Sequence, residues 1–164
     1  MEALHAPWRI QYILSPKPPE SDVSVFSRIA QSNDDITHHI IVRERTCFAI
    51  LNAYPYNGGH LMISPYKQVA ELADLTSQER SDLMDLTVRC QAVLSQVMKP
   101  DGFNIGINLG RAAGAGIAEH LHIHLVPRWS GDTNFMAVIA NTSVVPQALT
   151  ELAAQLRTAL APPA

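Results

Sequence analysis

Residues 120–126 read His-Leu-His-Ile-His-Leu-Val, and this stretch decides how the rest of the chain is interpreted. Its three histidines alternate with apolar residues. Side chains two positions apart in a β-strand point to the same face of the sheet, about 7 Å from one another. A strand over 120–129 would therefore present three imidazoles on one face and bury the intervening leucine and isoleucine side chains on the other.

Two chemistries use such a row of imidazoles. In one, a His-x-His pair supplies two ligands to a metal ion and a third ligand comes from elsewhere. In the other, one neutral imidazole attacks phosphorus while its neighbours donate hydrogen bonds to the phosphate oxygens. Histidine suits both roles because its pKa lies near neutrality. A set of packed, hydrogen-bonded histidines without a chemical role is the structural alternative.

Strand-like segments precede the row. Residues 38–44 and 46–51 are rich in β-branched and apolar residues and are close enough to pair as a hairpin. Residues 60–64 follow a turn that contains Pro55 and the Gly58-Gly59 pair, and they predict a third strand. A fourth is expected over 103–110, which makes the row itself the fifth.

Two helices complete the pattern. Thr76 with Glu79 forms a capping-box signature. After it the apolar positions recur at three- and four-residue spacing, at Leu83, Leu86, Cys90, Val93 and Val97. A C-terminal amphipathic helix is expected over 146–160, with Pro146 in its first turn. The sequence thus predicts an α+β fold with a five-stranded antiparallel sheet, one long helix and a C-terminal helix.

Composition limits the function classes. A length of 164 residues suits one domain, 1–164, with an N-terminal arm and Pro/Ser-rich loop over 1–24. The net charge of −3 offers no basic field for a nucleic-acid polymer, and no apolar run is long enough to span a membrane. The isolated Cys47 and Cys90 predict reduced core thiols, and a cytoplasmic protein is expected.

The row and the segments around it resemble the histidine-triad (HIT) superfamily, whose signature is His-φ-His-φ-His-φ-φ with φ apolar. The similarity is to the branch that acts on dinucleoside polyphosphates. It extends to APWR (6–9) with Tyr12, to an Asn…Gly-His element and to Asn-Leu-Gly-Arg at 108–111. It continues after the row through Pro-Arg-Trp and 131–135.

The resemblance implies roles for four histidines. His122, the middle member, would be the nucleophile that forms a covalent nucleotidyl-histidine intermediate. His124 would hydrogen-bond phosphate oxygens as charge develops, and His120 would help to fix the geometry of the row. His60 would lie across the site and contact phosphate.

The resemblance also implies a nucleotide-binding set. Asn52 would bind the ribose hydroxyls, and Asn108 would contact the phosphate chain or its ribose. Turn capping by the short amide is the alternative for both residues. The backbone N–H groups of Gly114 and Gly116 could bind phosphate oxygens, although relatives often carry a side-chain donor in this loop and this chain does not.

Arg128 and Trp129 follow the row and belong to the same candidate set. Arg128 could counter phosphate charge or pair with Asp132. Trp129 could stack on a base or pack in the core.

A structural zinc ion is not expected. Many relatives bind zinc through two cysteines near the N-terminus, a histidine after the Gly-His strand and the first triad histidine. The three matching outer positions here are Ser24, Ser27 and Gln68. Because all three ligands are replaced, we expect no metal at this position and no required cofactor. Mg²⁺ could accompany the nucleotide substrate.

The expected activity is hydrolysis of dinucleoside polyphosphates, with diadenosine tetraphosphate preferred, by a homodimer. Phosphorolysis with inorganic phosphate is an alternative, because the two reactions differ only in the second nucleophile. The same residues would also suit a nucleoside phosphoramidate hydrolase, a metal-dependent hydrolase or a nucleotide-binding regulatory protein with little turnover.

Overall fold

The structure, a computed structural model, describes residues 22–132 and 148–161. Most of the arm over 1–24, including APWR and Tyr12, therefore lies outside the described residues. So do residues 133–135 after the histidine row, and Pro146.

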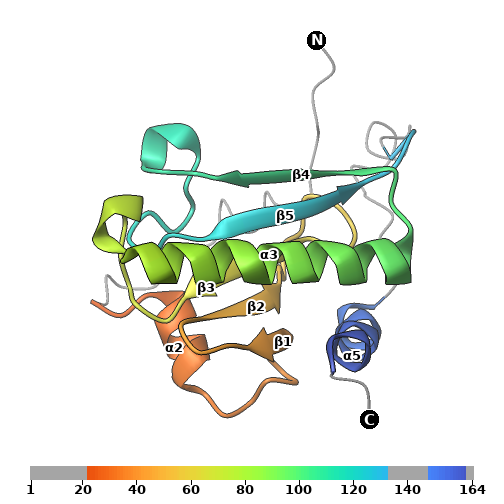
Figure 1. Cartoon of the computed structure of the whole chain (residues 1–164), viewed down its shortest axis with the longest axis horizontal. Coiled ribbons are helices and arrows are strands. Elements are labelled where there is room, and N and C mark those ends of the chain that lie inside the picture. Colours follow the sequence, from red (N-terminus) through yellow and green to blue (C-terminus); the bar gives the residue numbers. More distant parts are fainter. Residues whose placement is uncertain (1–21, 133–147, 162–164) are drawn as a thin grey trace.

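A five-stranded antiparallel sheet forms the centre of the fold (Figure 1), in the spatial order β1-β2-β3-β5-β4. Its strands are β1 Ile40–Arg43, β2 Cys47–Leu51, β3 Leu61–Pro65, β4 Gly102–Ile107 and β5 Ile123–Arg128. The sheet and the helices around it confirm the predicted α+β architecture. Strand β5 lies between β3 and β4, so its residues are flanked on both sides.

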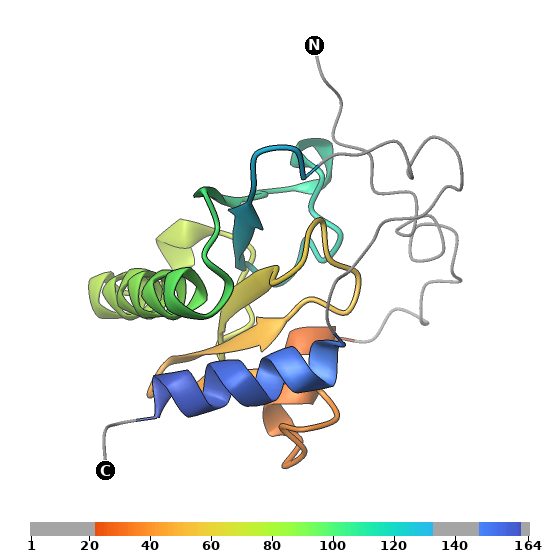
Figure 2. The ribbon, with the colours of Figure 1, turned by 90° about the vertical axis from the view of Figure 1, so that its right-hand side faces the viewer.

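Period-two alternation divides the sheet into two different faces. One face carries Ala49, Ile63 and Leu125 and packs against α3 (Ser77–Met98) and α5 (Leu149–Leu160). The opposite face carries Phe48 and Ile50 and is covered at its β1–β2 end by Phe26 of the short helix α2 (Val25–Gln31). Figure 2 shows α3 and α2 on opposite sides of the strands.

The capping box predicted for the long helix is present. Thr76 is the N-cap of α3, its side chain accepts from the Glu79 N–H, and the Glu79 carboxylate accepts from the Thr76 N–H. Two 3₁₀ turns, η2 Leu72–Asp74 and η3 Arg111–Ala113, lie in the connections. Within the described residues no helix has the length and apolar character needed to cross a membrane.

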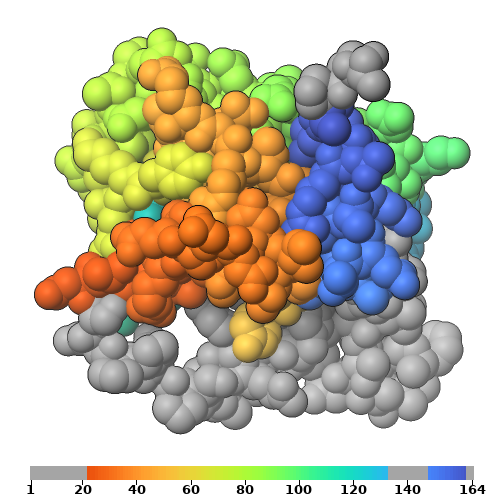
Figure 3. Space-filling view, turned by 90° about the horizontal axis from the view of Figure 1, so that it is seen from below, coloured from red at the N-terminus to blue at the C-terminus, as the bar shows by residue number. Residues whose placement is uncertain are grey.

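The C-terminal helix begins later than predicted. Ala148 is its N-cap, so α5 starts at Leu149. Its Arg157 guanidinium donates to the carbonyl oxygens of Ile40 and Asp35, at 2.7 Å each, which ties α5 to β1. Figure 3 shows α5 lying against the segment that contains β1.

The fifth strand also begins later than predicted, at Ile123. The β3–β5 register would place Pro65 opposite Leu121, and proline has no N–H to donate to the ladder. The Leu121 N–H bonds instead to the Val69 carbonyl at 2.7 Å. His120 and His122 therefore precede the strand, and only His124 lies within it.

Candidate active site

His122 and His124 lie on the sheet face opposite α3, next to one another. Their ring centroids are 4.7 Å apart in an edge-to-face arrangement. In the register of β5, His124 pairs with Met62 of β3 on one side and with Gly106 of β4 on the other. Because Gly106 has no side chain, the β4 side of the His124 ring is open.

The hydrogen bonds of His122 determine its tautomer. Its Nδ1 lies 2.9 Å from the carbonyl oxygen of His120, which can only accept, so Nδ1 carries the proton. The lone pair of the neutral ring is then on Nε2. The side chain is 5% exposed, and burial lowers the pKa of His122 from its ordinary value of 6.5. At neutral pH His122 is therefore a neutral imidazole with a nucleophilic Nε2.

His60 determines the tautomer of His124 in the same way. The His60 side chain is completely buried, and its Nδ1 accepts from the Tyr56 N–H at 3.0 Å. Its Nε2 therefore carries the proton and donates to Nδ1 of His124 at 2.9 Å. His124 must then carry its own proton on Nε2. Two neighbouring rings therefore offer different groups: His122 has a lone pair on Nε2, and His124 has an N–H donor on Nε2.

His120 does not share the open face with the other two. It is completely buried, its Nε2 donates to the Pro65 carbonyl at 2.9 Å, and its Nδ1 lies 2.5 Å from Oγ of Ser24. The expectation of three imidazoles presented together in one row is therefore wrong for His120, because Ser24 and Phe26 of the α2 segment enclose its ring. Its contribution to the site is the carbonyl that holds His122.

Two aromatic residues that the sequence did not single out support the histidines. Tyr56 stacks on His60 with ring centroids 5.0 Å apart, and Phe26 lies 4.9 Å from the His122 ring. Tyr56 precedes His60 by four residues in a turn, and Phe26 belongs to a short helix. Neither position has a local pattern that distinguishes it from an ordinary core or turn aromatic.

A cleft of about 310 Å³ opens beside His124 over the β4–β5 face. Its described lining residues are Tyr56, Asn104, Ile105, Gly106, Asn108, His124 and Val126. The structure thus places Asn108 and His124, both predicted from the sequence, in one cleft. His122, Arg128 and Trp129 are not part of this lining, but the His122 ring adjoins the cleft through its contact with His124.

Asn52 lies next to His60 and is buried. Its Oδ1 accepts from the Tyr54 N–H at 2.8 Å, and its Nδ2 is 3.4 Å from Nδ1 of His60. The turn-capping contact that the sequence left open as an alternative is therefore present in the structure. The same contact holds the Asn52 amide against His60.

The glycine loop forms a capped 3₁₀ turn. Gly114 has φ +89° and ends η3, and its N–H donates to the Arg111 carbonyl at 3.0 Å. This N–H is engaged within its own turn. The expectation of backbone–phosphate contacts in this loop therefore depends on Gly116 more than on Gly114.

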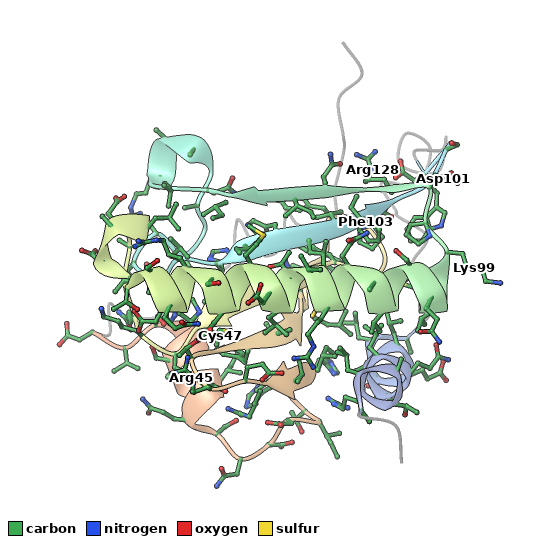
Figure 4. All side chains as sticks on the ribbon, in the orientation of Figure 1. Arg45, Cys47, Lys99, Asp101, Phe103 and Arg128 are labelled. Carbon is green, nitrogen blue, oxygen red and sulfur yellow. The ribbon has the colours of Figure 1, made fainter. Side chains whose placement is uncertain are left out.

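Arg128 pairs with Asp132. Its Nε and Nη2 donate to the carboxylate at 2.6 and 3.0 Å, and its Nη1 donates to Oδ1 of Asn104 at 2.7 Å. The Trp129 N–H also donates to Asp132. Figure 4 shows Arg128 at the end of the sheet near Asp101, where Lys99 closes α3. The sequence suggested two partners for Arg128, phosphate or Asp132, and the structure contains the pairing with Asp132.

A metal centre has no ligand set in the part of the chain that the structure describes. Over 22–132 and 148–161, no three His, Cys, Asp or Glu side chains converge so that they could hold a metal ion. His60, His122 and His124 are instead linked through hydrogen bonds and ring contacts. Both cysteines are buried and unpaired, as predicted.

Comparison with known proteins agrees with this geometry. The chain is 42% identical over 155 residues to the AP-4-A phosphorylase of Mycobacterium tuberculosis, covering 91% of this chain and 79% of the relative. It is 33% identical to the asymmetrical bis(5'-nucleosyl)-tetraphosphatase of Schizosaccharomyces pombe, covering 57% and 50% respectively. Among solved structures, a zinc-bound histidine triad protein from Mycobacterium smegmatis superposes with a TM-score of 0.65 at 26% identity, over 83% of this chain and 91% of that one. The HIT domain family matches residues 33–131. The chain belongs to the HIT family, in the branch that includes dinucleoside polyphosphate enzymes.

Proposed function

We propose that this protein cleaves dinucleoside polyphosphates, with diadenosine tetraphosphate as the preferred substrate, through a nucleotidyl-His122 intermediate. The observation that carries the proposal is the pair of tautomers beside the cleft. His122 has its lone pair on Nε2, and His124 has its proton on Nε2. One ring can therefore attack phosphorus while its neighbour donates to an oxygen of the same phosphate.

The reaction has two steps. Nε2 of His122 forms a bond to the α-phosphorus as the bond from phosphorus to the bridging oxygen breaks, and the leaving nucleotide takes that oxygen with its electron pair. The His124 N–H donates to an oxygen of the attacked phosphate and stabilises the charge that develops there. Water or inorganic phosphate then attacks the same phosphorus, the P–N bond breaks and His122 is regenerated. Positioning and charge stabilisation dominate such transfers, so the supporting contacts matter as much as the nucleophile.

The second nucleophile defines the second candidate function. The M. tuberculosis relative is named a phosphorylase, which favours inorganic phosphate, and the S. pombe relative is named a tetraphosphatase, which favours water. On diadenosine tetraphosphate, attack by water yields AMP and ATP. Attack by phosphate yields ADP and ATP.

The proposed assembly is a homodimer formed at β4. Within the described residues, β4 pairs only with β5, and the middle of the strand is exposed, with Ile105 50% accessible. An unprotected strand edge with an apolar side chain is a template for pairing with another strand. A second copy of this chain supplies such a strand by symmetry.

The decisive test is incubation with diadenosine tetraphosphate, with and without phosphate, followed by chromatography of the nucleotides. We expect turnover, and the presence of ADP or AMP among the products assigns the second nucleophile. His122→Ala should lower the rate by at least ~10³-fold, the loss expected when a covalent nucleophile is removed. His38→Ala, a histidine outside the site, is the control. Tight nucleotide binding without turnover would instead favour the regulatory protein.

A further inference from the structure

Four polar side chains from three separate segments meet behind the histidine row. Ser24 is the N-cap of α2, Ser27 lies in its first turn, Gln68 follows β3, and His120 precedes β5. Ser24 and His120 are almost fully buried, with 2% and 0% exposed. We call these four residues the Ser24 cluster.

Hydrogen bonds connect every member of the Ser24 cluster. Oε1 of Gln68 accepts from the Ser24 N–H at 2.8 Å and from the Ser27 hydroxyl at 3.1 Å. Because Nε2 of His120 donates to the Pro65 carbonyl, its Nδ1 must accept, and the Ser24 hydroxyl is the donor at 2.5 Å. The Ser24 oxygen also caps α2 by accepting from the Ser27 N–H.

By the family resemblance of the sequence, these four positions correspond to those that bind zinc in many relatives. Their donor chemistry here does not fit zinc, which in structural sites takes thiolates and imidazoles. Two positions hold neutral hydroxyls, one holds an amide, and the His120 ring uses one nitrogen for Pro65 and the other for Ser24. A metal ion would have to break bonds that already satisfy buried polar groups.

We propose that the Ser24 cluster is a metal-free replacement for the structural zinc site. It ties α2 to the histidine row and holds His120, whose carbonyl holds the tautomer of His122. Ser24 is thus a positioning residue that acts through His120. This second role depends on the proposed function, whereas the metal-free character of the cluster does not.

Metal analysis tests the first part without any activity measurement. Purified protein, refolded or expressed with zinc supplied, should contain far less than one zinc per chain. Its thermal midpoint should be the same with and without a strong chelator. One tightly held zinc per chain that is lost in Ser24→Ala would overturn the proposal, and so would a chelator-induced fall in the midpoint.

A converted variant tests whether the cluster occupies the zinc position. The triple substitution S24C/S27C/Q68H should restore a four-ligand set with His120, bind one zinc per chain and become chelator-sensitive. The control S77C/S130C adds two exposed thiols, one at the start of α3 and one after β5, and should bind none. A triple variant that folds but ignores zinc would show that these four side chains do not surround a metal-sized site, and the proposal would fail.

A pair of cap deletions tests the positioning role. Ser24→Ala and Thr76→Ala each remove an N-cap hydroxyl, but of the two only Ser24 bonds to a histidine of the row, His120. We expect Ser24→Ala to lower kcat by about tenfold with KM unchanged, and Thr76→Ala to leave kcat unaffected. Nitrogen NMR of His122 should show mixed tautomers only in Ser24→Ala. Equal kcat values and unchanged His122 tautomers in both variants would show that Ser24 has no positioning role, even if the protein is an active enzyme.

Discussion

Nε2 of His60 lies 2.9 Å from Nδ1 of His124, and the two residues are far apart in sequence but joined across the β3–β5 boundary. His60 is completely buried, and its other ring nitrogen accepts from the Tyr56 N–H. Its single proton can therefore only be on the nitrogen that faces His124. The family resemblance implied that His60 would contact phosphate, but its ring is completely buried and both of its nitrogens are engaged by Tyr56 and His124, so it instead determines which nitrogen of His124 can donate.

Removal of His60 should impair catalysis without removing any group that touches the substrate in our proposal. His60→Ala leaves Nδ1 of His124 without its fixed donor, so both tautomers become populated and the Nε2–H is present only part of the time. We expect kcat to fall roughly 10-fold to 100-fold, by analogy with the loss found when the partner that orients a metal-binding histidine is removed. Steady-state kinetics measures this change, and His38→Ala is the matched control. A wild-type kcat in a folded His60→Ala protein would contradict this orienting role of His60.

The pH dependence should follow from the burial of His122. Burial lowers the pKa of His122 below its ordinary 6.5, so the proposed nucleophile is more than half neutral at pH 6.5 and the loss of activity on protonation should occur at a lower pH than for a free histidine. Unfolding restores the ordinary pKa, so below pH 6.5 the unfolded chain binds more protons than the folded one. Stability therefore falls as the pH drops through this range. His120, whose pKa burial also lowers, adds to the effect.

Urea denaturation at several pH values in this range measures how steeply the free energy of unfolding falls with decreasing pH. His122→Gln removes one of the two titrating groups, so its stability should fall less steeply with acid than that of the wild type. Identical slopes in the two proteins would mean that the buried ring does not titrate as proposed.

The sequence predicted the sheet well because its determinants are local. The alternation in the row, the β-branched and apolar content of 46–51 and the capping box at Thr76 depend only on residues close in sequence, and the structure confirms the elements that they predict. The start of β5 was missed because it depends on Pro65, which is opposite Leu121 only after β3 and β5 have paired.

The site was predictable only in part, because much of it depends on contacts between segments that are far apart in the sequence. The alternating pattern identifies the histidines, but their tautomers depend on the Tyr56 N–H and the His120 carbonyl, contacts that exist only in the folded chain. The burial of His120 and its bond to Ser24 likewise require segments 96 residues apart to meet. The pairing of Arg128 with Asp132 was local enough to be considered, at a separation of four residues.

A side chain at Gly106 should obstruct the cleft. Gly106 pairs with His124 in the β4–β5 register and lines the cleft, and a Cβ built there meets no atom within 4 Å. Gly106→Val should therefore fold, because β-branched residues suit strands, but should lower kcat/KM by at least about tenfold, or about 1.4 kcal/mol. Gly102→Val is the matched control, because Gly102 is in the same strand, also has open space and lies outside the lining. Equal losses in the two variants would point to the strand and not to the cleft.

The exposed edge of β4 should control the oligomeric state. Ile105 is 50% accessible in the middle of this strand, and a lysine there would place a charge in the centre of any pairing between two copies. Native proteins use lysine on edge strands for this purpose. We therefore expect Ile105→Lys to convert a dimer into a monomer in light scattering coupled to size exclusion. Ile36→Lys, at a 66% exposed isoleucine outside β4, should leave the dimer intact. If Ile105→Lys remains dimeric and Ile36→Lys does not, the interface lies at the α2–β1 connection and the two sheets do not join through β4.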